Sequence, residues 1–379
     1  MTKTILVDCG HIRNPYSGLG QVALQYARAL INASQSNNSS QSNNSSQSDE
    51  AVRPLFLAHP RFDEFHRFVK VNNGHVCTPR FSLFGTIMRT LNKEWTRYAY
   101  TKQDHALRHA LHRNFYQIPN CDKKPFVLTI HDMHLLNDKP KRQKHAISRL
   151  QKSVMRANAI GFISQYAQQI AAQYVDFGDA EQHIIYNGVN KPKNPKKPSW
   201  FEDNMRPFLF SVAQIAPSKN YHILPAALNH IPDFRLIIAG RKKKYYAPKI
   251  EEAAKRENVA ARVLMPGAVD EGEKTWLLQH CDGFVFPSLR EGFGMPVVEA
   301  LHFGKPVFCF NNTALPEACG KHAFYWKNQE PKDMADLIRD NISSNQSAQL
   351  ARQQWAQGFS WDKNANAYLD IYHQLIKNS

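Results

Sequence analysis

Residues 286–300, FPSLREGFGMPVVEA, decide how the second half of this chain folds. The apolar run at residues 283–286 is typical of a buried strand, and Pro296 suits the first position of a helix, where its missing N–H costs nothing. We therefore predict a strand, a glycine-rich loop and a helix that ends at Gly304. Strands and helices alternate in this way along the whole chain, which indicates a parallel α/β fold.

Two carboxylates frame this loop, Glu291 before the predicted helix and Glu299 inside it. They could accept hydrogen bonds from vicinal hydroxyls of one polyhydroxylated ligand. The glycines keep side chains away, so main-chain N–H groups of Phe293, Gly294 and Met295 can face an anion at the helix N-terminus. The pattern suits a sugar nucleotide. The alternative for Glu299 is a solvated helix carboxylate.

With this loop between them, Glu291 and Glu299 resemble the E-x7-E signature of retaining GT-B glycosyltransferases of family 4, glycosyltransferase group 1, of the bacterial surface-glycan type. Family-like segments also lie at residues 6–30, 129–132, 163–164, 187–189, 213–220, 236–240 and 359–372. The resemblance therefore covers nearly the whole chain. It implies an α/β fold of the GT-B type, in which two Rossmann-like domains face a cleft.

The chain's 379 residues favour two domains. We expect an acceptor-binding domain at residues 1–195, a nucleotide-sugar-binding domain at 205–358 and, from the resemblance, a helix at 359–379 that crosses back to the first domain. Strands are predicted at 5–7, 55–58, 126–130, 159–164, 184–186, 208–212, 236–239, 263–265, 283–286 and 307–310, and helices at 21–31 and 165–174. The Pro/Lys-rich stretch 191–198 reads as the linker. The polar repeat at 34–48 should be a disordered loop.

Composition limits the partners. No run approaches the roughly 18 apolar residues that span a bilayer, and the N-terminus reads as a strand, so we expect a soluble cytoplasmic protein. The net charge of +16 favours an anionic partner: nucleic acid, a membrane surface or a phosphorylated substrate. No nucleic-acid-binding module is evident, so nucleic acid is not expected. Basic runs such as 139–144, 191–197 and 241–244 are more often solvated loops.

Candidate site residues in the first half follow predicted strands. His131 comes directly after the strand at 126–130, at the cleft edge, and the resemblance places it near the donor sugar as a catalytic residue. The alternative is a histidine satisfied by a neighbouring main-chain group. Gly18 and Gly20 precede the first predicted helix and would let the backbone approach the donor diphosphate or acceptor. A tight turn needs glycines too.

In the second half, Lys219 follows a strand and precedes a helix expected to start near Asn220, where it can meet a diphosphate. The family commonly has an arginine at the position of Gln214, so Arg241 is a possible substitute cation. Gly267 resembles the family segment that presents backbone to the nucleobase. The chain lacks an Asp-x-Asp motif, and no metal or cofactor is expected if lysine and helix dipoles neutralise the leaving group.

A basic amphipathic helix is predicted at residues 84–98. Its charged and aromatic side chains could touch an anionic membrane or a lipid-linked acceptor, and they include Arg89, Lys93, Trp95 and Arg97. The alternative is a domain helix that buries its apolar face.

Together with the resemblance, the sequence predicts a metal-independent, retaining transferase that moves a hexose from a UDP- or GDP-linked donor to a lipid-linked or lipopolysaccharide-type glycan. We expect it to act in the cytoplasm or at the inner face of the cytoplasmic membrane. Two alternatives stay open. One is another GT-B enzyme, a sugar-nucleotide epimerase or a phosphorylase. The other is a non-catalytic polyanion-binding protein, whose binding would depend steeply on salt.

Overall fold

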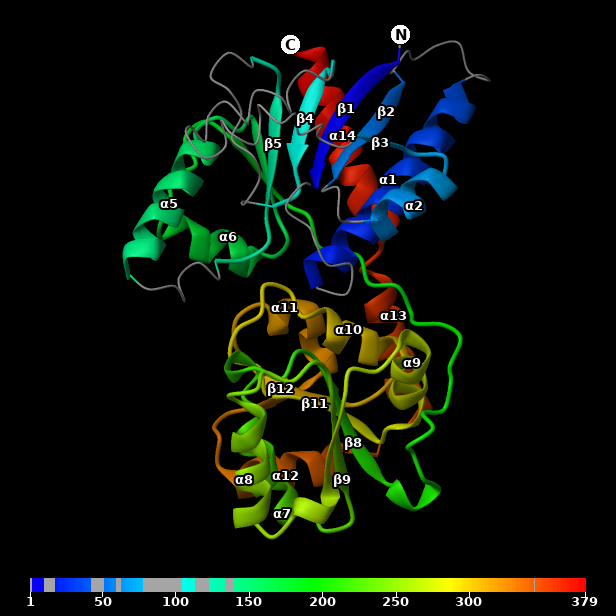
Figure 1. Cartoon of the computed structure of the whole chain (residues 1–379), viewed down its shortest axis with the longest axis vertical. Coiled ribbons are helices and arrows are strands. Elements are labelled where there is room, and N and C mark those ends of the chain that lie inside the picture. Colours follow the sequence, from blue (N-terminus) through cyan, green and yellow to red (C-terminus); the bar gives the residue numbers. More distant parts are fainter. Residues whose placement is uncertain are drawn as a thin grey trace. The chain divides into compact units, whose positions relative to one another are not determined.

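The computed structural model describes residues 2–9, 18–41, 51–58, 63–77, 104–112, 123–133, 140–343 and 345–379. The chain forms two compact units, Met1–Gly188 with Ser360–Ser379, and Val189–Phe359. Each unit contains its own parallel sheet (Figure 1). Because the boundary falls after Gly188, the Pro/Lys-rich stretch 191–198 belongs to the second unit and is not a free linker. Its Lys196 N–H donates to the Gly272 carbonyl at 2.9 Å.

The first unit is built on a seven-stranded sheet of order β3-β2-β1-β4-β5-β6-β7. Its strands are β1 (Lys3–Cys9), β2 (Val52–Ala58), β3 (His75–Cys77), β4 (Leu107–Ala110), β5 (Phe126–Ile130), β6 (Ala159–Phe162) and β7 (Glu181–Ile184). The central strands are buried throughout, as in a sheet covered on both faces. The strand expected at 184–186 instead covers Glu181–Ile184. Its first two residues, Glu181 and Gln182, are polar and exposed, which an edge strand such as β7 tolerates.

The helices of this unit are α1 (Gly18–Gln41), α2 (Asp63–Val71), α5 (Pro140–Val154), α6 (Gln165–Ala172) and α14 (Trp361–Lys377). The expectation of a disordered loop from residue 34 is wrong for residues 34–41, which continue α1. Ser34 fits the helix because its hydroxyl donates to the carbonyls of Leu30 and Ile31, at 2.8 and 2.9 Å. Residues 42–48 of the repeat lie outside the described part of the chain.

A network of buried polar side chains connects α14 to α1, β4 and β5 within the first unit. The hydroxyls of Tyr26 and Tyr372 lie 2.6 Å apart, and Tyr372 also contacts His109 Nδ1 at 2.5 Å. Thr129 Oγ1 lies 2.7 Å from His109 Nε2 and 2.6 Å from the Tyr368 hydroxyl oxygen, so it links the two side chains. Burial, aided by the nearby charge of His131, lowers the pKa of His109 to about 3. The imidazole is therefore neutral at pH 7.

The second unit contains a six-stranded sheet of order β10-β9-β8-β11-β12-β13. The strands are β8 (Phe208–Val212), β9 (Arg235–Ala239), β10 (Val263–Gly267), β11 (Gly283–Phe286), β12 (Val307–Phe310) and β13 (Phe324–Trp326). The helices are α7 (Leu224–Asn229), α8 (Ala247–Arg256), α9 (Glu271–His280), α10 (Met295–His302), α11 (Leu315–Cys319), α12 (Pro331–Asn341) and α13 (Gln346–Gln357). One hydrophobic core joins α7, α8 and α12 to this sheet, as Leu224, Ile250 and Ile338 show.

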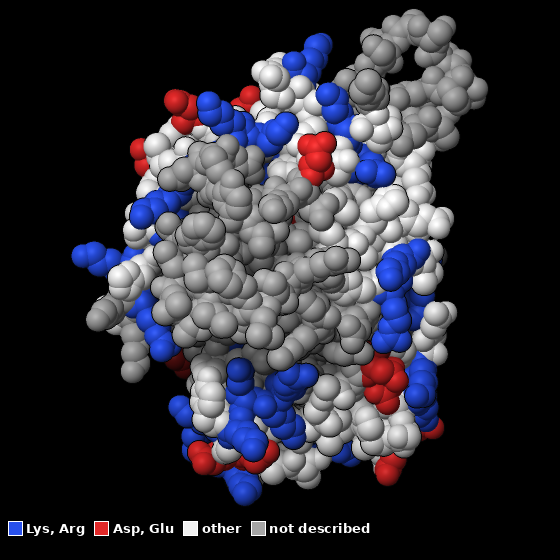
Figure 2. All heavy atoms as spheres, turned by 45° about the horizontal axis from the view of Figure 1, so that its top comes forward, with Lys and Arg blue, Asp and Glu red and all other residues white. Residues whose placement is uncertain are grey.

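Lysine and arginine side chains are spread over the described part of the face in Figure 2, with acidic side chains among them. In the described residues, no helix is both long enough and apolar enough to cross a membrane.

Candidate active site

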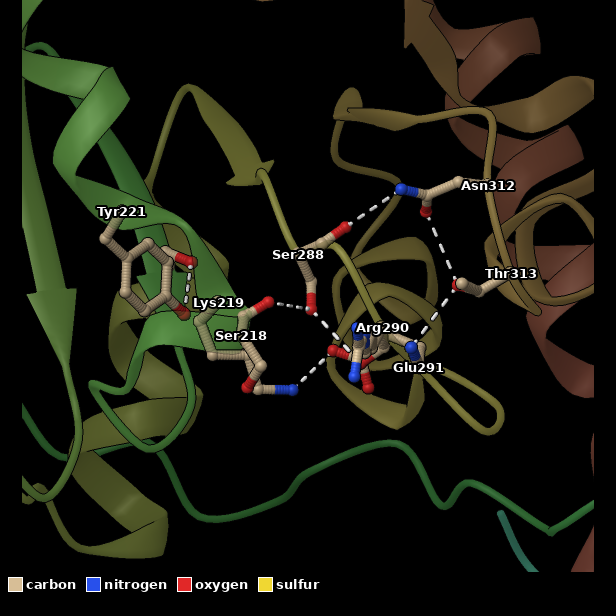
Figure 3. Close-up of polar contacts among 9 residues, drawn as sticks. Ser218, Lys219, Tyr221, Ser288, Arg290, Glu291, Asn312 and Thr313 are labelled. Carbon is tan, nitrogen blue, oxygen red and sulfur yellow. Dashed lines mark hydrogen bonds and ion pairs between the residues drawn. The ribbon is translucent and has the colours of Figure 1, made fainter. Parts of the chain in front are cut away.

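Two loops meet at the carboxyl edge of the second sheet, where the parallel neighbours β8 and β11 end. Main-chain bonding joins them, because the Leu289 N–H donates to the Ser218 carbonyl at 2.9 Å. Ser288 Oγ donates to the same carbonyl at 3.3 Å. This pairing brings Lys219, from the loop after β8, into an ion pair with Glu291, from the loop after β11 (Figure 3).

The Lys219–Glu291 pair is largely shielded from water, with side chains 18% and 12% exposed. The Lys219 ammonium also lies 5.3 Å from the centre of the Phe286 ring, a cation–π contact. A carboxylate and a lysine that share a ligand site can hold opposite ends of a polar substrate, the carboxylate its hydroxyls and the lysine its phosphates. An incoming anion would have to share Lys219 with Glu291.

The local backbone at Lys219 differs from the prediction. Lys219 closes a short 3-10 turn, Pro217–Lys219, and Asn220 adopts the left-handed conformation with φ of 58°. A second 3-10 turn follows, and α7 begins only at Leu224. The expectation of a helix starting near Asn220 is therefore wrong, because the left-handed residue interrupts the helical path. The positive charge at this point comes from Lys219 itself and not from an adjoining helix N-terminus.

A third loop, after β12, supports Glu291. The Glu291 N–H donates to Thr313 Oγ1 at 3.3 Å, and Asn312 Nδ2 donates to the Ser288 carbonyl at 3.4 Å (Figure 3). Thr313 has a φ of 52°, which is strained for a β-branched residue. Such strain costs roughly 1–3 kcal/mol and persists only where surrounding contacts hold it. Asn312 and Thr313 were not predicted from the sequence, because nothing in their local pattern shows that they contact the loop after β11.

The glycine-rich loop leads into α10 as expected, except that Met295 is the first helical residue and Pro296 the second. Gly294, the residue before the helix, has a φ of 105°, a conformation that requires glycine. It offers no side-chain cap. Pro296 has no N–H and the Val297 N–H donates to the Gly294 carbonyl at 3.1 Å, so Met295 supplies the main-chain N–H that this turn can present to an anion. The Phe293 side chain is buried against Phe359, with ring centres 5.2 Å apart. Phe293 can therefore offer a ligand only its main chain.

Glu299 lies on α10 and is paired with a residue that the sequence analysis did not single out. Its Oε1 atom lies 2.9 Å from Lys274 Nζ, and its side chain is 15% exposed. Glu299 is therefore not the solvated helix carboxylate of the alternative interpretation. Each of the two carboxylates in the signature thus has a lysine partner, Lys219 for Glu291 and Lys274 for Glu299.

The loops after β9 and β10 also begin at the carboxyl edge of the second sheet. The Ile215 N–H donates to the Arg241 carbonyl at 3.0 Å, and the Gly240 N–H donates to the Gly267 carbonyl at 2.7 Å. The Arg241 side chain is exposed. Gly267 has a φ of 95°, and a Cβ atom there would meet nothing within 4 Å, which leaves open space beside its backbone.

The candidate residues of the first unit lie on separate elements. His131 follows β5 and is buried, and its Nε2 donates to the Leu111 carbonyl at 2.6 Å. This is the main-chain contact that the alternative interpretation anticipated, and a catalytic role for His131 stays a prediction. Gly18 and Gly20 lie in the first turn of α1, not in a loop before it, because the helix begins three residues earlier than expected.

The residues proposed to contact an acceptor or a membrane cannot be placed. Arg89, Lys93, Trp95 and Arg97 lie outside the described residues. Within the part of the chain that the structure describes, no three His, Cys, Asp or Glu side chains are grouped so that they could hold a metal ion.

Comparison with known proteins identifies the second unit. Residues 192–357 match the family model described as "Glycosyl transferases group 1". They belong to the glycosyl transferases of group 1. This group 1 domain contains all the paired site residues described above, Lys219, Lys274, Glu291 and Glu299.

The serotype-specific mannosyltransferase WbdA of Escherichia coli is 27% identical over 257 residues, which cover 59% of this chain and 30% of WbdA. The chain therefore matches less than a third of that relative's length. Sucrose-phosphate synthase from Thermosynechococcus elongatus superposes with a TM-score of 0.75 over 100% of both chains, at 16% identity. Anabaena HepE in complex with UDP-glucose gives a TM-score of 0.70 over 97% of this chain and 100% of HepE, at 17% identity. These likenesses confirm the predicted α/β fold of the GT-B type.

Proposed function

We propose that the chain is a retaining glycosyltransferase that moves a hexose from a nucleotide sugar to a lipid-linked or lipopolysaccharide-type glycan. The observation that carries the proposal is the meeting of Lys219 and Glu291 at the carboxyl edge of the sheet in a group 1 domain. Ligands of open parallel sheets bind at this edge. A nucleotide sugar has both an anionic diphosphate for the lysine and hydroxyls for the carboxylate.

In this proposal the bond between the sugar and the diphosphate breaks, and the acceptor hydroxyl attacks the sugar carbon on the face from which the diphosphate leaves. The acceptor proton passes to the departing phosphate. Lys219 and the Met295 N–H at the start of α10 stabilise the charge that develops on the diphosphate. Lys219 takes the place that a metal ion holds in other transferases. Glu291 and Glu299 accept hydrogen bonds from donor hydroxyls, and His131 contacts the transferred sugar.

Names of the similar proteins support a hexose donor. WbdA is a mannosyltransferase by name, and the HepE crystal contains UDP-glucose. We therefore propose a UDP- or GDP-linked hexose.

The acceptor proposal draws on charge. The net charge of +16 suits a phosphorylated lipid carrier, and α5 offers a described surface for it. Residues 140–156 contain no acidic residue, and Arg142, Lys144, Arg149 and Lys152 are exposed on this stretch. A basic surface of this kind attracts anionic lipid headgroups. We propose a cytoplasmic protein in peripheral contact with the inner face of the membrane.

A two-step experiment tests the proposal. Thermal shift against UDP-, GDP-, ADP- and dTDP-sugars identifies the donor, because a bound ligand stabilises the folded state. Transfer to a polyprenyl-diphosphate-linked glycan is then followed with and without EDTA, and NMR of the product assigns the anomeric configuration. We expect transfer with retention that EDTA does not abolish.

The alternatives give different products. An epimerase would release free sugar and nucleotide without an acceptor, and a phosphorylase would require inorganic phosphate. A polyanion-binding protein would show no stabilisation by any nucleotide sugar, but would bind polyanions with a steep dependence on salt.

A further inference from the structure

Lys274 is a largely shielded cation between two carboxylates of unequal exposure. Its Nζ lies 2.9 Å from Glu299 Oε1 and 2.9 Å from Glu271 Oε2. The side chains of Lys274 and Glu299 are 13% and 15% exposed, whereas that of Glu271 is 75% exposed. The shielded contact is therefore the one that joins α9 to α10, and the contact with Glu271 lies at the surface.

The lysine remains charged in this position. Burial alone lowers the pKa of Lys274, but the charges of Glu299 and Glu271 and their hydrogen bonds outweigh burial and raise the pKa above its ordinary value. Removing one member of a shielded ion pair leaves the other charge uncompensated. Glu299 thus depends on Lys274 for a counter-charge and for a fixed orientation.

Lys274 contacts one oxygen of the Glu299 carboxylate, and the other oxygen can accept hydrogen bonds from a ligand. A carboxylate has two oxygens, each able to accept more than one hydrogen bond. Lys274 contacts Oε1 of Glu299, and the hydrogen bonds and ion pairs of the described residues place no partner on Oε2. Glu299 lies on α10, whose N-cap residue Gly294 has no side chain to cap the helix. A ligand at the first turn of α10 is therefore near this carboxylate.

We propose that Lys274 is a positioning residue for the donor: it holds one oxygen of Glu299 so that the other accepts hydrogen bonds from a vicinal diol of the nucleotide sugar. The inference rests on the proposed function and deepens it. A nucleotide sugar contains two candidate diols, on the ribose and on the hexose. The chemistry at Glu299 is the same for both.

Calorimetry on the full chain tests the role and distinguishes the diols. Three ligands are titrated: the nucleoside diphosphate of the donor, its 2′,3′-dideoxy analogue and the complete nucleotide sugar. Lys274→Met removes the charge and keeps much of the side-chain length. Glu271→Gln is the matched control, because it removes the other partner of the same lysine and leaves the contact with Glu299.

If the ribose supplies the diol, the wild type prefers the ribonucleotide over its dideoxy analogue, and Lys274→Met loses about tenfold in affinity for the ribonucleotide but not for the analogue. If the hexose supplies it, Lys274→Met loses affinity for the nucleotide sugar but not for the diphosphate. In either case Glu271→Gln matches the wild type. Adding Glu299→Gln to Lys274→Met should cost little more, because both changes remove one interaction.

Two results would overturn the positioning role. One is wild-type affinity of Lys274→Met for all three ligands. The other is an equal loss for all three, the dideoxy analogue included, which would show only a structural clamp between α9 and α10. If the wild type bound no nucleotide at all, the proposed function would fall, and this inference with it.

Discussion

Lys219 and Glu291 neutralise each other, so a change at either residue exposes the charge of its partner. The pair is only 18% and 12% exposed, and an unpaired charge at such a site is unfavourable. Effects on folding and on ligand binding must therefore be measured separately at these positions.

Lys219→Ala should weaken binding of nucleoside diphosphate and of the complete donor by about 10- to 100-fold, the range of one charge-assisted hydrogen bond. Lys219→Arg keeps the charge and should lose less. Calorimetric titration of diphosphate, monophosphate and donor into each variant checks this. Equal losses for monophosphate and diphosphate would mean that Lys219 does not contact the second phosphate, and Arg241 would become the residue to test.

Glu291→Ala should mainly lower kcat, whereas Glu299→Ala should mainly weaken donor binding. The reason is that Glu291 pairs with the proposed phosphate-binding lysine and so lies nearer the bond that breaks. Kinetics at saturating donor separate the two effects. Wild-type activity in both variants would contradict the two-carboxylate model.

Among the elements of the first unit, helix α14 packs against β6, and the Tyr368 hydroxyl lies close to the backbone of Gly161. A Cβ atom on Gly161 would lie 2.3 Å from the Tyr368 hydroxyl oxygen, which itself is hydrogen-bonded to Thr129. The strand and the helix thus meet at a position where only glycine fits.

Gly161→Ala should lower the free energy of unfolding by about 1–3 kcal/mol, the usual cost of overpacking. Tyr368→Phe in the same chain should restore part of the loss, because it removes the atom that clashes. Urea denaturation of the wild type, the two single variants and the double variant measures this coupling. Additive losses would show that the clash is relieved elsewhere.

The same network predicts a dependence of stability on pH. The pKa of His109 is lowered to about 3 in the folded chain, so between pH 3 and about 6.5 the unfolded chain binds more protons. His109 therefore destabilises the folded state as pH falls, by about 2 kcal/mol at pH 5 relative to pH 7. His109→Gln should show a smaller difference between pH 7 and pH 5 in urea denaturation. An unchanged difference would assign the acid sensitivity to other groups.

At the scale of the whole molecule, the described carboxylate and lysine pairs all belong to one unit. Lys219, Lys274, Glu291 and Glu299 lie within Val189–Phe359, which also has its own sheet and hydrophobic core. Nucleotide binding and sugar transfer should therefore be separable.

Residues 189–359 expressed alone should fold and bind the nucleoside diphosphate within about tenfold of the full chain, a change of about 1.4 kcal/mol. They should not transfer sugar, because the first unit is expected to bind the acceptor. Circular dichroism, calorimetry and the transfer assay test the three statements. A folded fragment without nucleotide affinity would show that the first unit supplies essential donor contacts.

Five of the six strands of the second sheet, all but β13, and the loop between Glu291 and Glu299 could be predicted from the sequence. Buried strands, glycines and prolines act over a few residues, so their signals can be read locally. β5 and β11 match their predicted residues for the same reason. Gly294 likewise occupies the left-handed position that only glycine adopts readily.

Which side chains meet depends on the tertiary structure. Strand β4 was missed because its Arg108 and His109 look exposed in sequence, yet Arg108 is buried against Asp8 at 2.5 Å. The contacts of Lys219 with Glu291 and of Lys274 with Glu299 likewise join separate elements. Such partners depend on strand order and on how helices pack, and a local pattern of apolar and polar residues specifies neither.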